Sequence, residues 1–503
     1  MHSFTFSKLA AILKVEPLQL HDDAVIESLL TDSRKLLIPT GTAFFSIDGP
    51  QKSANAFIPQ LYEKGVRCFI IGKGFSAAEL KKYPEGNFIQ VSNVLEALQT
   101  IATAHRHQFN YPVIGITGSN GKTIVKEWLY QLLNNNYNIV RNPKSYNSQV
   151  GVPLSIWNMS SSHDLGIFEA GVSLPGEMGR LQKIIDPGIG VFTYVGDAHA
   201  EGFQNLEQKI NEKLNLFINS STVIYCADDE TLEASMTRFK ETRNKNLRLF
   251  GWSRQIPADL YIIRTERKND GTAVFCLYQK NEFNFFIPFT DDASVHNAIT
   301  CCCVLLYLDI HISAIAAHIY QLRPVEMRLE LKEGINNCSI INDSYSADLH
   351  SLSIALDFLV QQQQHNKRSI ILSDVLQSGR SATHLYKDIA NILGEKKLNR
   401  FIGIGPGISA HAAVFDKIIN KNFFESTEAF LKNIHLLQFH DETILLKGAR
   451  VFRFERISHA LEQKMHETVL EINLNALRDN LKLYGRLLKK DVKMMVMVKA
   501  FSY

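Results

Sequence analysis

The sequence lacks an apolar run long enough to cross a membrane. The longest candidate, Ala298–Leu308, is shorter than the roughly 18 residues needed and is followed by Asp309 and His311. The first residues, Met1–Leu13, lack a basic region, a long apolar stretch and a small-residue cleavage site. We therefore expect a cytoplasmic protein without a signal peptide and without a membrane partner.

Cysteine is scarce, and its spacing excludes a disulfide or zinc framework. The 503 residues include seven cysteines, an odd number, with no pairs at metal-binding intervals. Cys301, Cys302 and Cys303 fall in an apolar stretch that predicts a helix. Consecutive helical residues do not share a face, so we expect small buried side chains there and no metal site.

A strong excess of charge of one sign is also absent. The net charge is +3, and basic runs such as Lys81-Lys82 and Lys396-Lys397 stop at two residues. No basic stripe is interleaved with aromatic residues, so we expect no nucleic-acid partner. A chain of this length is expected to hold about three or four domains, each with its own core.

What the sequence does have is a glycine-rich segment between an expected strand and an expected helix. The apolar run Pro112–Ile116 leads into G-I-T-G-S-N-G-K-T at Gly115–Thr123, and Ile124–Leu133 predicts a helix. This is the layout of a phosphate-binding loop, in which backbone N–H groups and the helix dipole face a polyphosphate. We expect Lys122 to reach the β- and γ-phosphates and the Thr123 hydroxyl to ligate magnesium.

Two interpretations of this segment are open from the pattern alone. The general motif has a glycine where Ile116 stands, and Gly115 comes one position early. The alternative to a phosphate site is a glycine-rich turn with a surface lysine.

The first part of the chain mixes short strands and helices, with an expected strand at Cys68–Gly72. A parallel α/β region, a β-rich insertion and a second parallel α/β region follow it. Tyr261–Phe289 predicts an antiparallel patch that turns at Asn269-Asp270-Gly271. One long helix is expected over Val295–Leu322, with a boundary at Pro324. The expected strands of the parallel regions are Gly166–Glu169, Val191–Tyr194, Val223–Tyr225, Ser339–Ile341, Ser369–Leu372, Phe401–Ile404 and Thr443–Leu446, and the helices include Asn205–Phe217, Leu349–Val360 and Ala382–Leu393.

Several segments, together with the loop, point to one family. They are Thr31–Arg34, Asn147–Pro153, Phe168–Gly171, Ala198–Phe203, His296-Asn297 and Asn342–Ala347. In this order they resemble the motifs of the Mur ligases, the ATP-dependent amide ligases of peptidoglycan synthesis. That family usually reads G-x-T-G-x-N-G-K-T in the loop, so Ile116 is then expected.

The resemblance implies ATP and Mg²⁺ as cofactors and a role for each matching residue. It implies a nucleotide site at Gly118, Ser119, Asn120, Gly121, Lys122, Thr123, Asn297, Arg328, Asp343 and Tyr345. It implies magnesium ligands at Thr123, Glu169 and His199, and substrate contacts at Ser33, Arg34 and Asn147. It implies catalytic roles for Lys122, Lys213, His199 and Glu169.

A simpler structural interpretation is open for three of these residues. Lys213 has the spacing of a lysine that this family carbamylates, but it also fits a solvated helix face. A carbamate needs a neutral amine, so burial or nearby cations must lower the pKa of Lys213. Glu169 alone would fit a salt bridge at a strand end. His199 alone would fit a core or surface histidine, since imidazole prefers softer metals than magnesium.

The segment Asn342–Ala347 resembles the family member that joins D-alanyl-D-alanine to UDP-N-acetylmuramoyl-tripeptide through an acyl phosphate. The alternatives are another Mur-type ligase, a folylpolyglutamate synthase, or a nucleotide-binding partner protein with weak catalysis. The departure from the family pattern around Gln377, in Leu372–Gly379, motivates the last of these. The segments Ser46–Pro50 and Lys447–Arg450 also depart from the family pattern. We assign no catalytic role to Gln377.

The last segment, His466–Tyr503, resembles the start of the alanine racemases at Leu470–Leu477 and Val496–Tyr503. Lys499 occupies the position of the lysine that binds pyridoxal phosphate in that family. One helix, Asn475–Leu488, and one strand, Met494–Val498, cannot build a barrel pocket. We expect a truncated racemase stub with a vestigial Lys499, and pyridoxal phosphate only in a full-length fusion.

The expected fold is α/β, with a three-domain Mur ligase architecture, a central parallel sheet with a phosphate-binding loop, a Rossmann-like C-terminal domain and a racemase stub. The expected domains are 1–110 for the uridine-nucleotide substrate, 111–323 for ATP, 324–462 as the C-terminal ligase domain and 463–503 as the racemase fragment. We expect the ligase part to be monomeric and the racemase part of a full-length fusion to be dimeric.

Overall fold

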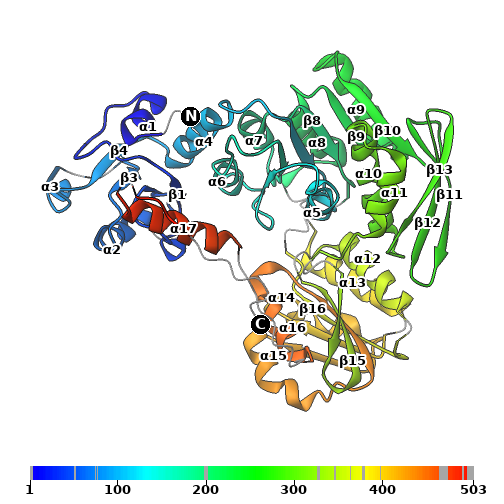
Figure 1. The fold of residues 1–503 in the computed structure, drawn as a ribbon. Coiled ribbons are helices and arrows are strands. Elements are labelled where there is room, and N and C mark those ends of the chain that lie inside the picture. The colour runs from blue at the N-terminus through cyan, green and yellow to red at the C-terminus, as the bar shows by residue number, and fades with distance from the viewer. Residues whose placement is uncertain are drawn as a thin grey trace. The chain divides into compact units, whose positions relative to one another are not determined.

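The computed structural model describes residues 4–49, 53–73, 75, 77–196, 202–325, 329–344, 347–362, 364–376, 380–396, 398–463, 474–489 and 492–495. The chain separates into two compact units, Met1–Glu462 and Gln463–Tyr503, and the first contains three β-sheets (Figure 1).

The first sheet is parallel and lies in the N-terminal region. Its described strands pair in chain order and are β1 (Ser28–Leu30), β2 (Thr42–Phe45), β3 (Cys68–Ile71) and β4 (Asn87–Gln90). The accompanying helices are α1 (Phe6–Leu13), α2 (Ile58–Glu63), α3 (Ala77–Leu80) and α4 (Val94–Arg106). Every residue of β3 is buried, as an apolar run inside a parallel sheet predicts.

The second sheet holds the glycine-rich loop. Its strand order is β13-β12-β11-β10-β9-β8-β5-β7-β6. The strands are β5 (Val113–Thr117), β6 (Ile139–Arg141), β7 (Leu165–Glu169), β8 (Ile189–Phe192), β9 (Thr222–Cys226), β10 (Arg248–Ser253), β11 (Leu260–Lys268), β12 (Gly271–Tyr278) and β13 (Asn281–Ile287). The chain leaves β5 toward β6 and β7 on one side and toward β8 and β9 on the other. The carboxyl end of β5 is therefore a topological switch point, where α/β sheets bind ligands.

The antiparallel patch predicted from Tyr261–Phe289 is confirmed. β11 pairs in parallel with β10 but antiparallel with β12, and β12 pairs antiparallel with β13. Figure 1 shows these three long strands at one edge of the sheet. The helices of this region are α5 (Lys122–Leu133), α6 (Gly151–Ile156), α7 (Met178–Ile185), α8 (Leu206–Leu214), α9 (Glu230–Thr242), α10 (Asp292–Tyr307) and α11 (Ile312–Tyr320).

The single helix expected over Val295–Leu322 is wrong, because the structure has α10 and α11 there. Asp309 adopts a left-handed φ of 56°, which ends the first helix. His311 then caps α11 by accepting a hydrogen bond from the backbone N–H of Ser313. The three cysteines of α10 are fully buried in the core, as small hydrophobic residues.

The third sheet has the order β14-β15-β19-β16-β17-β18, and only β14 runs antiparallel to its neighbour. Its strands are β14 (Glu330–Gly334), β15 (Cys338–Asp343), β16 (Lys367–Ser373), β17 (Arg400–Ile404), β18 (Lys421–Phe424) and β19 (Glu442–Lys447). The larger helices are α12 (Leu349–Gln361), α13 (Ala382–Glu395), α14 (Pro406–Ala410), α15 (Thr427–Asn433) and α16 (Glu455–Leu461). The Rossmann-like description of this region and the domain boundaries at 110, 323 and 462 stay predictions.

The second unit contains one described helix, α17 (Leu474–Leu487), close to the range expected. Of the expected strand Met494–Val498, only Met494 and Met495 are described, and they belong to no strand. Among the described helices of the whole chain, none is both long and apolar enough to cross a bilayer.

Candidate nucleotide site

The glycine-rich loop leaves β5 at the switch point and depends on two glycines. Gly118 and Gly121 have left-handed φ values of 142° and 85°. A Cβ atom at Gly118 would lie 2.0 Å from Oγ1 of Thr193, and one at Gly121 would lie 2.4 Å from Oδ1 of Asn297. The Thr193 hydroxyl donates to the carbonyl of Asn120 at 2.6 Å. The loop is thus packed against Thr193, which follows β8, and against Asn297 of α10 at distances that only glycine permits.

Two lysines meet at one carbonyl of the loop. The Lys122 ammonium donates to the carbonyl oxygens of Gly118 and Ser119, each at 2.9 Å, and Lys213 donates to the Gly118 carbonyl at 3.0 Å. Lys213 lies on α8 and is 2% exposed, so it does not lie on a solvated face. Burial, aided by the nearby Lys122 and Lys209 cations, holds the pKa of Lys213 well below its usual value.

Glu169 ends β7 beside the loop, and its carboxylate is buried. Its backbone N–H donates to Oδ1 of Asn142 at 2.6 Å, but neither carboxylate oxygen has a hydrogen-bond partner in the described part of the chain. A buried carboxylate without a partner is costly, and a cation would compensate its charge. The Thr123 hydroxyl, 3.1 Å from Oγ of Ser145, supplies another hard oxygen donor at the start of α5. These donors fit Mg²⁺. No three His, Cys, Asp or Glu side chains come together as a metal cluster anywhere in the described residues, this site included.

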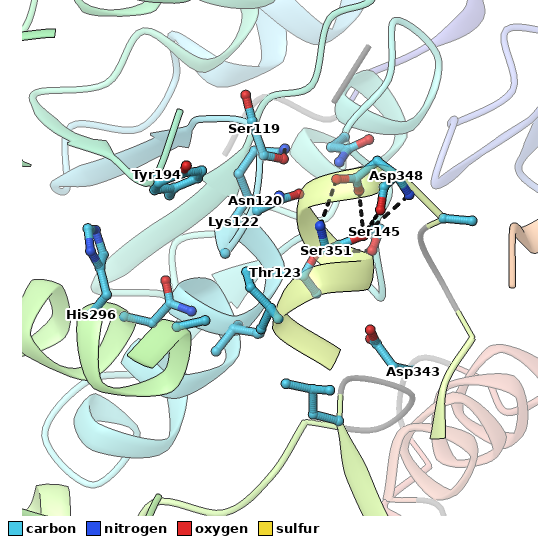
Figure 2. A pocket seen from close by; sticks show the side chains of 18 of the residues that line it. Ser119, Asn120, Lys122, Thr123, Ser145, Tyr194, His296, Asp343, Asp348 and Ser351 are labelled. Atoms are coloured by element: carbon cyan, nitrogen blue, oxygen red, sulfur yellow. Dashed lines mark hydrogen bonds between the residues drawn. The ribbon is translucent and has the colours of Figure 1, made fainter. Parts of the chain in front are cut away.

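A cavity of about 880 Å³ opens over the loop (Figure 2). Its walls come from the second sheet region and from the third. The polar and aromatic residues that line it include Lys122, Thr123, Ser145, Asn147, Tyr194, Arg254, His296, Asn297, Asp343, Asp348, Ser351 and Arg450. A pocket of this size with a loop of backbone donors suits a nucleotide.

One end of the pocket, where polar and aromatic side chains meet, lies at the start of α10. Asn297 is 4% exposed, and the ring of His296 meets Trp252 edge to face at 4.7 Å. Burial, aided by the Arg254 cation, lowers the pKa of His296 to about 4. Nε2 of His296 has no partner among the described residues. His296 is therefore a neutral ring near pH 7, with a polar atom available to a ligand.

The third sheet contributes a buried ion pair and a helix cap. Asp343 and Lys447 stand opposite each other at the ends of β15 and β19, and the Lys447 ammonium pairs with the Asp343 carboxylate. Asp348 caps α12 by accepting from the backbone N–H of Ser351 at 2.9 Å, and the Ser351 hydroxyl also donates to its carboxylate (Figure 2). Asp348 and Ser351 are not among the residues predicted from sequence, although an acidic N-cap before an apolar run is a usable signal.

Residues 116–305 match the family model of the Mur ligase middle domain. The UDP-N-acetylmuramoyl-tripeptide–D-alanyl-D-alanine ligase of Bacillus subtilis is 26% identical over 87% of this chain and 93% of that protein. The ligase of the same name from Rickettsia prowazekii is 27% identical over 84% of this chain and 92% of that protein.

Solved structures show the Mur ligase α/β fold. MurF from Acinetobacter baumannii has a TM-score of 0.76 and 22% identity, covering 92% of this chain and 99% of that one. MurF from Thermotoga maritima in complex with ADP has a TM-score of 0.70 and 20% identity, covering 86% of this chain and 96% of that one.

The predicted substrate residues do not all lie at the pocket. Asn147 lines the pocket, but Ser33 and Arg34 do not. They belong to a short 3-10 turn, and the exposed Arg34 guanidinium binds the Asp32 carboxylate with two hydrogen bonds of 2.8 and 2.9 Å. The next residue, Lys35, donates to the hydroxyl of Tyr146, so the turn still touches the segment that precedes Asn147.

Four predicted residues, His199, Arg328, Tyr345 and Lys499, lie outside the described residues, as does Gln377. Asp374, from the segment that departs from the family pattern, has a local role. Its carboxylate accepts from the backbone N–H groups of Gly407 and Ile408 and from the Tyr386 hydroxyl. It therefore anchors the start of α14. Sequence spacing gave no signal for Tyr194 or Arg254, which only the fold brings to the pocket.

Proposed function

We propose that the chain is an ATP-dependent ligase that joins D-alanyl-D-alanine to UDP-N-acetylmuramoyl-tripeptide in peptidoglycan precursor synthesis. The observation that carries this proposal is the buried Glu169 carboxylate, unpartnered in the described residues, beside a phosphate-binding loop that also receives the buried Lys213. The two relatives described above, which are named for this reaction, match along 93% and 92% of their length.

The chemistry needs an activated carboxyl group. The terminal carboxylate of the tripeptide attacks the γ-phosphorus of ATP, which gives an acyl phosphate and ADP. The amine of D-alanyl-D-alanine then attacks the acyl carbon, and the carbon–oxygen bond to phosphate breaks as the amide forms. Such a reaction depends on positioning and on neutralising phosphate charge more than on a covalent nucleophile. Lys122 and the loop N–H groups at the start of α5 supply both.

Glu169 and Thr123 would hold Mg²⁺, and His199 is proposed as a further ligand. When bound, the metal neutralises charge on the transferred phosphoryl group. Lys213 is proposed to be carbamylated: its neutral amine attacks the carbon of CO₂ and loses a proton, which leaves an anion beside the loop. The lowered pKa of Lys213 supports this step because only the neutral amine is a nucleophile.

The remaining contacts are proposed from the family resemblance. Asn297, Arg328, Asp343 and Tyr345 are proposed to contact the nucleotide. Asn147 is proposed to contact the acceptor from the pocket wall, while Ser33 and Arg34 would contact its uridine part from outside the pocket.

The test measures phosphate release from ATP with UDP-N-acetylmuramoyl-tripeptide, with and without D-alanyl-D-alanine. We expect release that depends on the dipeptide. The variant Lys122→Ala should lower it at least about 100-fold, since it removes a charge that stabilises the transferred phosphoryl group. Lys183→Ala, at an exposed position of α7, is the matched control and should leave release unchanged.

Folded protein that releases no phosphate in response to the dipeptide would contradict the proposal. Release with a single amino acid in place of the dipeptide would favour another Mur-type ligase, and release with a folate and glutamate would favour a folylpolyglutamate synthase. Nucleotide binding without turnover would favour a partner protein.

We further propose that residues 463–503 form the start of an alanine racemase-like domain, on the resemblance at Leu470–Leu477 and around Lys499. The ligase region is proposed to act as a monomer and the racemase region of a full-length fusion to dimerise. A polypeptide of residues 1–503 should show no pyridoxal absorption band, and Lys499→Ala should leave phosphate release unchanged. A band that Lys499→Ala removes would overturn the proposal that Lys499 is inert there.

A further inference from the structure

The segment 142–147 forms the wall of the pocket next to Thr123. It begins directly after β6, and Ser145 and Asn147 both line the cavity. Oγ of Ser145 lies 3.1 Å from Oγ1 of Thr123. The position of this segment therefore determines which side chains lie beside the Thr123 hydroxyl, the proposed magnesium ligand.

A fully buried lysine holds this segment from inside. Lys126 lies on α5 one turn after Thr123 and is 0% exposed. Its ammonium donates to the carbonyl of Asn142 at 2.8 Å and to the carbonyl of Lys144, and it pairs with Oε1 of Glu127 at 3.1 Å. The buried ammonium thus has two carbonyl acceptors and a carboxylate of opposite charge, and a buried charge requires such partners.

The backbone conformation of the segment shows why such an anchor is needed. Lys144 has a left-handed φ of 51°, which is unfavourable for a residue with a side chain. Lys126 binds the carbonyl of this same residue. A conformation of this kind persists where the surroundings impose it, and such sites cluster where groups are positioned for function.

A buried asparagine connects the same segment to the metal-binding strand. Asn142 is 0% exposed, its Oδ1 accepts from the backbone N–H of Glu169 at 2.6 Å, and its Nδ2 donates to the carbonyl of Tyr146 at 2.7 Å. The Asn142 side chain therefore connects the start of the segment to Tyr146 near its end and to Glu169 on β7. The Lys126 ammonium, by holding the Asn142 carbonyl, fixes Ser145 and Asn147 relative to Glu169.

We propose that Lys126 is a positioning residue of the ligase: through the carbonyls of Asn142 and Lys144 it holds segment 142–147 so that Ser145 and Asn147 face the carboxylate end of the acceptor. This inference rests on the proposed function for its kinetic consequences. It predicts that loss of the Lys126 ammonium impairs use of the acceptor and leaves ATP binding nearly intact, because Lys126 does not touch the loop at Gly118–Lys122 in the described contacts.

The experiment compares Lys126→Met with wild type and with Lys183→Met, the exposed control on α7. We measure the KM for UDP-N-acetylmuramoyl-tripeptide, kcat, the affinity for ATP and hydrogen exchange of segment 142–147. A displacement of reacting groups by about 1 Å can cost on the order of 100-fold. We therefore expect kcat/KM for the acceptor to fall at least about tenfold, ATP affinity to change less than about threefold, and exchange in 142–147 to rise.

Lys126→Arg keeps the charge and should recover part of the acceptor kinetics, because its guanidinium can still donate to both carbonyls. Unchanged acceptor kinetics in Lys126→Met, or an equal loss of ATP affinity, would overturn the inference. If wild type itself shows no dipeptide-dependent release, the proposed function fails, and hydrogen exchange still decides whether Lys126 orders the segment. If Lys126→Met does not fold, Lys126→Gln takes its place; failure of both would show a requirement of folding and would overturn the inference.

Discussion

At the scale of single residues, the site concentrates ionisable groups where water does not reach. Glu169 is buried without a partner in the described chain, Lys213 is nearly fully buried, and His296 has a buried ring nitrogen. Burial disfavours the charged forms of Lys213 and His296. The buried Glu169 carboxylate costs stability in the protein alone, and a bound cation would compensate this cost.

Replacing Glu169 with glutamine should lower the activity without lowering the stability of the fold. The variant removes the charge and keeps the shape, so we expect phosphate release to fall at least about 100-fold. The free energy of unfolding without nucleotide and metal should stay equal or rise, because the buried charge is gone. Urea unfolding in a chelator and the release assay measure the two effects. A clear loss of stability would show that Glu169 has a structural partner instead.

His296 should give the protein a specific pH dependence. Its pKa is about 4 in the folded chain and about 6.5 in the unfolded chain, so the unfolded state binds the proton first as the pH falls. Its contribution to stability is complete above about pH 6.5 and is lost progressively toward pH 4. Between pH 7 and pH 5 we expect this residue to account for about 2 kcal/mol of lost unfolding free energy.

The measurement compares wild type with His296→Phe by urea unfolding at both pH values. The variant keeps an aromatic ring at this position and removes the titrating group. Parallel losses in the two proteins would show that the pKa of His296 is similar in the folded and unfolded chains.

At the scale of elements, the unit β5–loop–α5 could be predicted because its signals are local. An apolar run, the glycines and Lys122-Thr123 follow one another, and the structure confirms the strand and helix within two residues. The break at Asp309 was missed since the apolar pattern continues through it, and only a left-handed residue interrupts the helix. β14 was missed because it is an edge strand of mostly charged residues with little burial.

The variant Gly121→Ala tests whether the close packing of the loop against Asn297 is needed for ATP binding. The substitution forces a side chain into left-handed backbone, which costs about 1–2 kcal/mol, and it also pushes Asn297 away. We expect lower stability and a loss of ATP affinity. Gly176→Ala is a matched control, because Gly176 has a similar φ of 83° with no atom within 4 Å of the added carbon. The control should lose stability alone. Equal ATP affinity in both variants would mean that the contact with Asn297 is not needed.

At the scale of the whole chain, the pocket belongs to the first unit. Its lining runs from Ser119 to Val451, and sequence spacing could not predict which residues of the third sheet region would join the loop. Tyr194, Arg254 and Asp348 reach it only because strands distant in sequence bring them there. The motif residues Asn297 and Asp343 were found from the family resemblance, not from spacing.

Removing residues 464–503 should therefore leave the ligase intact. The cut retains Glu462, which accepts from Lys332 at 2.8 Å and closes the third sheet region. We expect dipeptide-dependent release within about twofold of the full chain, and a similar melting temperature, since no lining residue is removed. A large loss of activity would mean that the second unit contributes to the reaction.

The buried cysteines have a practical consequence. Burial raises the pKa of all seven thiols above the usual value, so none should react readily with alkylating reagents while the chain is folded. Cys68 lies in the first sheet, Cys338 in the third, and the other five in and around the second. Labelling each thiol during unfolding would thus show, without any added probe, the order in which the three sheets open to solvent.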